Sequence, residues 1–73
     1  MVSKAVKNQL KMSFQQIQIN LENNYKDLAI QARKDTAILL QQLYDSGEVK
    51  GRTYEKYKAK LDEYTKRMEN YHH

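Results

Sequence analysis

The chain has 73 residues, and its 13 lysines and arginines against 9 aspartates and glutamates leave a formal net charge of +4. A chain of this size forms one small domain and buries only about 60% of its unfolded surface, which disfavours an enclosed substrate pocket of ordinary size. It has no cysteine, so disulfides and thiolate metal sites are excluded and an intracellular setting is favoured.

No apolar run reaches the roughly 18 residues that a membrane span requires. The first eleven residues carry Lys4, Lys7 and Lys11, where a signal peptide would have its apolar stretch. We therefore expect a single domain over residues 1–73, without a transmembrane segment, in the cytoplasm.

Apolar and small side chains follow one helical stripe through the first part of the chain. They are Leu10, Phe14, Ile17, Leu21, Tyr25, Leu28, Ala32, Thr36, Leu39 and Leu43. Their mean spacing is about 3.67 residues, which keeps them on one face of a nearly straight helix. The stripe is compatible with one helix over residues 3–44 or with two helices separated at Asn23 and Asn24.

We favour two helices, with Asn24 as the N-cap of the second and Asp27 close to its positive end. Some apolar residues lie off the stripe, and a bundle of three similar helices would bury them better than one long helix paired with a short one. These residues are Ile19, Ile30, Ile38 and Leu40. The alternative is one long helix with an antiparallel second helix, dimerising as a coiled-coil bundle.

Both glycines, Gly47 and Gly51, lie in one short segment, and the chain has no proline. After them, residues spaced by three and four form an unbroken helical seam. The seam consists of Tyr54, Tyr57, Leu61, Tyr64, Met68 and Tyr71. The prediction is therefore an all-α three-helix bundle with helices at about 3–22, 25–45 and 52–71.

The second and third helices are expected to form an antiparallel hairpin, because the segment that joins them is short. Residues 24–46 carry three basic and three acidic groups, whereas the segments on either side each carry a net charge of +2. The neutral second helix is therefore expected at the centre of the bundle.

The stretch from Leu43 to Leu61 resembles the short C-terminal domain known as SHOCT. The residues that match the family's spacing are Gly47, Val49, Tyr54, Lys58 and Leu61. The resemblance covers about a quarter of the chain and implies a helical hairpin used for association, with no catalytic residues. Independently of kinship, Gly47 is expected to end a helix in the left-handed conformation and Val49 to pack back onto the hairpin.

A candidate interaction surface is formed by basic residues that recur at helical spacing. They are Lys4, Lys7 and Lys11 in the first helix and Lys56, Lys60 and Arg67 in the third. A solvated helix face would also explain them. Four of the six tyrosines lie in the third helix, where they are expected to be core residues rather than a stacking platform for nucleic acid. Helical geometry is expected to point Lys56, Lys58 and Lys60 away from the rings.

Catalysis has little support in the sequence. The two histidines, His72 and His73, are adjacent at the C-terminus, and the sequence leaves open whether they are native or a purification-tag remnant. Ser3, Ser13 and Ser46 have no base in the sequence to activate them. We expect no catalytic residue, no cofactor and no metal site.

These observations predict a non-enzymatic protein-interaction module with an assembly or regulatory role. It is expected to self-associate or to bind another protein, because a short chain cannot cover its own apolar surface completely. The alternative function is a small basic accessory protein that binds nucleic acid, suggested by an isoelectric point near 9.4.

Overall fold

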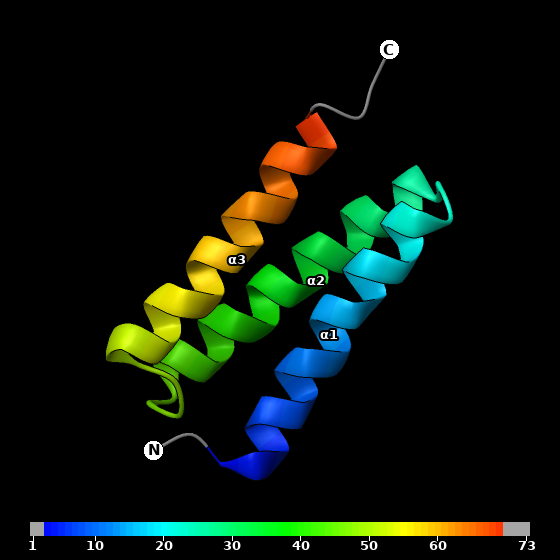
Figure 1. Cartoon of the computed structure of the whole chain (residues 1–73). Coiled ribbons are helices and arrows are strands. Elements are labelled where there is room, and N and C mark those ends of the chain that lie inside the picture. Colours follow the sequence, from blue (N-terminus) through cyan, green and yellow to red (C-terminus); the bar gives the residue numbers. More distant parts are fainter. Residues whose placement is uncertain (1–2, 70–73) are drawn as a thin grey trace.

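The structure is a computed structural model that describes residues 3–69. It contains three helices, α1 (Lys4–Glu22), α2 (Lys26–Asp45) and α3 (Gly51–Glu69) (Figure 1). The predicted all-α three-helix bundle is confirmed, and the alternative single long helix is not formed because the chain turns between α1 and α2. Tyr71, His72 and His73 lie outside the described residues.

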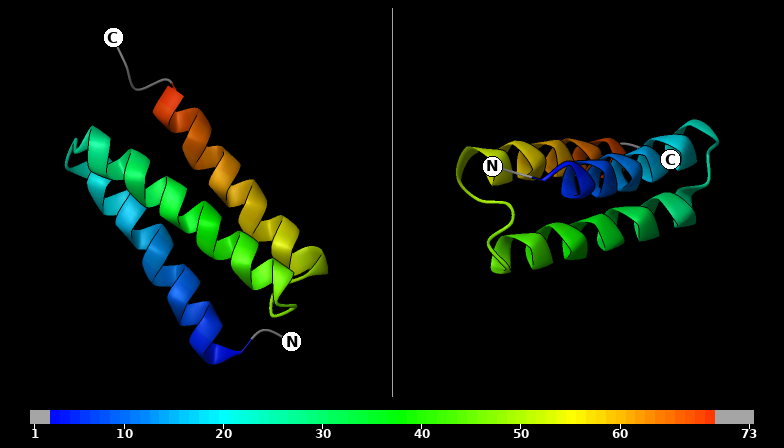
Figure 2. Two further views of the ribbon diagram at one scale, coloured as in Figure 1. Left: turned by 180° about the vertical axis from the view of Figure 1, so that it is seen from behind. Right: turned by 90° about the horizontal axis from the view of Figure 1, so that it is seen from below.

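The α2 helix packs against both α1 and α3, as the charge distribution predicted. α1 and α3 run in the same direction and α2 runs in the opposite one (Figure 1). Seen from below, α1 and α3 form one layer and α2 forms the other (Figure 2). The bundle measures 41 × 18 × 14 Å, and its Cα radius of gyration is 12.5 Å.

The turn between α1 and α2 corrects the predicted role of Asn24. Asn24 adopts the left-handed conformation, with φ of 61°, and the residue at the N-cap of α2 is Tyr25, which makes no side-chain capping bond. The amide of Asn24 donates to the carbonyl of Leu21 at 3.2 Å, and that of Tyr25 to Asn20 at 2.8 Å. This is a Schellman motif, so Asn24 ends α1 instead of starting α2.

The same motif ends α2, and here the sequence prediction is confirmed. Gly47 has φ of 85°, and its amide donates to the carbonyl of Tyr44 at 3.1 Å. The next amide, that of Glu48, donates to Leu43 at 3.0 Å. Only glycine adopts this conformation without a steric penalty, so the chain reverses at this point and Val49 returns into the core, where it is fully buried.

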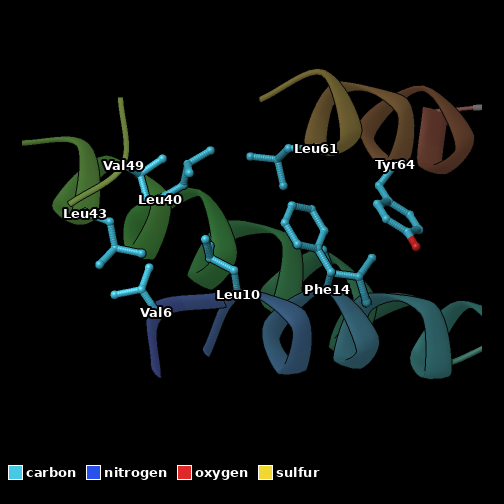
Figure 3. Close-up of a cluster of buried hydrophobic side chains, with 9 residues drawn as sticks. Val6, Leu10, Phe14, Leu40, Leu43, Val49, Leu61 and Tyr64 are labelled. Atoms are coloured by element: carbon cyan, nitrogen blue, oxygen red, sulfur yellow. The ribbon is translucent and has the colours of Figure 1, made fainter. Parts of the chain in front are cut away.

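The core lies along the line where the three helices meet (Figure 3). Its buried apolar members are Val6, Leu10, Phe14, Ile17, Leu40, Leu43, Val49, Leu61 and Tyr64. Of the residues in the predicted third-helix seam, Leu61 and Tyr64 are buried, and Tyr54, Tyr57 and Met68 are partly buried against the core. One buried polar residue, Thr36, joins the α1–α2 contact through a hydroxyl–hydroxyl hydrogen bond of 2.8 Å to Ser13.

The bundle does not bury all of the apolar residues that three helices were expected to cover. Leu40 is buried, whereas Ile19 and Ile38 are exposed, as is Leu28 of the main stripe. The reason is geometric, because Ile38 follows the buried Thr36 by two residues, or about 200° around the helix, and so lies on the far side of α2. Three helices in two layers leave that side without a neighbour.

Candidate functional site

A groove of about 480 Å³ lies between α1 and α3, and all of its lining residues belong to these two helices. Four lysines line it, two from each wall: Lys7 and Lys11 from α1, and Lys56 and Lys60 from α3. We call this feature the basic groove. It brings together four of the six basic residues that the sequence nominated as an interaction surface, although the two pairs are about 50 residues apart in the chain.

The other two nominated residues lie elsewhere. Lys4 is the first residue of α1 and is exposed, outside the groove lining. Arg67 lies on α3 with its guanidinium carbon 5.3 Å from the centroid of the Tyr64 ring, so it is near one end of the groove without lining it.

Three aromatic rings form the apolar part of the groove lining. Phe14 from α1 stacks on Tyr57 and Tyr64 from α3, with ring centroids 5.9 and 6.1 Å apart and interplanar angles of 18° and 28°. Phe14 and Tyr64 are also core residues (Figure 3). The groove therefore rests on the same side chains that hold α1 against α3, which makes its shape a property of the fold.

The lysines do not all point away from the rings, which corrects the sequence prediction. The Lys60 ammonium lies 5.0 Å from the centroid of the Phe14 ring, and that of Lys56 lies 6.0 Å from the centroid of Tyr57. The aliphatic part of each lysine side chain is flexible and lies along the apolar surface, while the ammonium group stays in solvent. Each ammonium is thereby held near the groove by a ring face.

Carboxamides complete the lining, and they were not among the residues predicted from the sequence. They come from Asn8, Gln15 and Gln18 of α1. The Tyr64 hydroxyl donates to Gln18 Oε1 at 2.9 Å, and Gln18 Nε2 donates to Glu22 at 2.9 Å. A signal was present in the sequence, because Gln15 and Gln18 continue the helical row of Lys7 and Lys11.

The chemistry of the groove is that of an anion-binding surface. The ten described residues that line it include four cationic side chains and no carboxylate, imidazole or thiol. Lysine ammonium groups and carboxamide N–H groups donate hydrogen bonds to carboxylate or phosphate oxygens. The groove can thus bind an anionic ligand that also has an apolar group for the rings.

The three serines have structural partners. Ser3 is the N-cap of α1, where its hydroxyl oxygen accepts from the amide of Val6 at 3.2 Å. Ser13 pairs with Thr36, and the Ser46 hydroxyl donates to the carbonyl of Leu43 at 3.0 Å. Each hydroxyl thus takes part in a helix end or a helix contact.

A second, smaller depression of about 260 Å³ lies on the α1–α2 side of the bundle. It is bordered by Leu28, which is 56% exposed, and mostly by uncharged polar side chains. Within residues 3–69, no three histidine, aspartate or glutamate side chains are grouped in a way that could hold a metal ion. No helix in this part of the chain is both long and apolar enough to cross a membrane.

Comparison of the chain with family models, with curated proteins and with solved structures finds no match. The resemblance of Leu43 to Leu61 to the SHOCT hairpin stays a prediction. The basic groove and the exposed apolar residues are the features of the described chain that bear on its function.

Proposed function

We propose that this chain is a non-enzymatic interaction module that binds an acidic segment of another protein in the basic groove. The observation that carries the proposal is the pairing of Lys7 and Lys11 with Lys56 and Lys60 across a ring-lined groove that contains no acidic side chain. Such a surface suits carboxylates that flank an apolar residue, since charge complementarity adds to burial of the apolar group. An assembly or regulatory role in the cytoplasm stays the predicted setting.

An acidic protein segment fits this groove better than a nucleic acid does. Single-strand binders stack bases on open ring faces, whereas here Phe14 is stacked on two tyrosines and has the Lys60 ammonium over it. The groove also contains no arginine, the side chain best suited to pairing with phosphate through two parallel hydrogen bonds. The nucleic-acid alternative therefore becomes one outcome of the binding test.

We expect the variant Lys7→Gln/Lys60→Gln to bind an acidic, phenylalanine-containing peptide about tenfold more weakly than the parent chain, because two partly screened charge contacts are lost. Fluorescence anisotropy with a labelled peptide at low and at physiological salt would measure this. The matched control is Lys26→Gln/Lys34→Gln, which removes the same charge from exposed positions of α2.

Equal weakening of both variants would show that only net charge matters and would contradict the proposal. A single-stranded oligonucleotide belongs in the same assay. If it binds more tightly than the peptide and the groove variant abolishes that binding, the function is the nucleic-acid alternative instead.

Self-association is a second candidate, supported by the α1–α2 side of the bundle. Leu28 is exposed there beside Ser13, Gln16 and Gln31, with Asp35 as the single charged residue of that depression. The chain has a net charge of +4, so two copies repel each other. The repulsion is smallest at a face such as this one, whose lining contains no lysine or arginine.

We expect the weight-average mass in sedimentation to rise with concentration from monomer toward dimer, and the variant Leu28→Lys to abolish the rise. The control Ala59→Lys adds the same charge at an exposed position of α3, a helix that contributes no residue to the depression. A parent chain that stays monomeric up to millimolar concentration would rule out self-association.

A further inference from the structure

The walls of the basic groove repeat with the period of a helix. Lys7, Lys11 and Gln15 lie four residues apart on α1, and Lys56, Lys60 and Tyr64 lie four apart on α3. Both walls are helices whose backbone groups are already bonded within the helix, so an extended peptide finds no strand edge to pair with. A helical ligand brings its own backbone hydrogen bonds and presents side chains at matching intervals.

The groove has an electrostatic direction along its length. Lys7 and Lys11 lie in the first half of α1 and Lys56 in the first half of α3, and the N-termini of these helices are at the same end of the bundle (Figure 1). Lys60 is the middle residue of α3. At the other end the opposite charges of Glu22 and Arg67 lie near the Gln18–Tyr64 hydrogen bond and offset each other. The end of the groove that holds Lys7, Lys11 and Lys56 is therefore more positive than the end that holds Gln18 and Tyr64.

The helix dipoles of the two walls reinforce this direction. α1 and α3 both point the positive end of their dipole toward the lysine end of the groove, because they run in the same direction. A ligand helix has its negative dipole end at its C-terminus, so it is stabilised when that terminus lies among the lysines.

We infer that the ligand of the basic groove is an amphipathic helix that lies antiparallel to α1 and α3 and carries its acidic residues in its C-terminal half. An apolar side chain on the same face contacts the Tyr57 ring, which is the half-buried ring of the groove, whereas Phe14 and Tyr64 are buried. With α2 on the opposite side, the ligand is the fourth helix of a four-helix bundle. This inference rests on the proposed function and specifies the form and direction of the partner.

The test uses the full chain and peptides of about 18 residues, close to the 19 residues of α1. Two peptides have identical composition and a central phenylalanine, but one carries its glutamates in the C-terminal half and the other in the N-terminal half. A side-chain staple in both equalises their helix content, because acidic residues near a C-terminus weaken a free helix. A third, unstapled peptide contains a central proline that prevents a continuous helix.

We expect the stapled peptide with the acidic C-terminal half to bind about threefold to tenfold more tightly than its reversed counterpart. A nitroxide at its C-terminus should broaden the amide signals of Lys7 and Lys56, whereas one at its N-terminus should not. The proline peptide should bind more weakly than either stapled peptide.

Each contrary result has a distinct meaning. Equal affinity of the two stapled peptides, or tighter binding of the reversed one, overturns the direction while the groove still binds acidic segments. Tighter binding of the proline peptide than of both stapled peptides overturns the helical form of the ligand, again without affecting the proposed function. If none of the three peptides binds, the inference and the proposed function fail together.

Discussion

Replacement of Phe14 with alanine is expected to cost about 3–5 kcal/mol of unfolding free energy. Phe14 is 3% exposed and stacks on both Tyr57 and Tyr64, so its ring joins α1 to α3. A domain of this length has a total stability of only about 4–11 kcal/mol, so this loss is a large fraction of the total. Urea denaturation followed by circular dichroism measures the loss.

Two variants make the Phe14 result interpretable. Met12→Ala shortens a side chain of the same helix that is 65% exposed, and it should change the free energy by no more than about 0.5 kcal/mol. Phe14→Leu keeps most of the apolar volume and should lose clearly less than Phe14→Ala. A loss for Phe14→Ala as small as that for Met12→Ala would contradict the α1–α3 contact and with it the basic groove.

The variant Leu61→Ala is expected to lose about 2–5 kcal/mol, because Leu61 is 4% exposed in the core and its removal leaves a cavity. Leu61 comes from α3, the helix that contributes the fewest buried residues, so few other side chains can fill the space. Thermal and urea unfolding of the variant would measure the loss. Amide hydrogen exchange should show faster opening of α3 than of α2.

The matched control for Leu61 is Leu28→Ala, which removes the same atoms from a side chain that is 56% exposed. We expect Leu28→Ala to lose well under half as much unfolding free energy as Leu61→Ala, because folding removes less apolar surface from water at position 28. If the two variants melted at the same temperature as the parent chain, Leu61 would lie at the surface and the third-helix seam would not be a packing seam.

The helical elements could be predicted because their signals are local. Gly47 and Val49 lie where a helix must end and the chain must return, and the expected left-handed turn and buried valine are both observed. Asn24 shows the limit of such reasoning. An asparagine between two helices can cap the second or adopt the left-handed conformation that ends the first, and residue type alone does not distinguish these roles.

The exposed apolar residues show why burial was predicted less well than helix positions. A mean spacing of about 3.67 residues keeps a stripe on one face, but it does not say how wide the covered face is. Leu28 and Ile38 remain exposed because each helix contacts its neighbours over only part of its circumference. The width of the covered face depends on where the other helices lie, which is information that no single helix contains.

The sequence by itself determined the helical character of the chain, the turn at Gly47, and the rows of lysine on the first and the third helix, and it favoured a break near Asn24. Only the tertiary structure decided that Lys7 and Lys11 face Lys56 and Lys60 across one groove. The pair of helices α1 and α2 has two sides on which α3 could pack. If α3 packed on the side of α1 that carries Ser13 and Gln16, the lysines of α3 would lie far from the lysines of α1. The observed side is the one on which Phe14 packs against Tyr57 and Tyr64, and these residues are distant in the chain, so no local pattern contains the contact.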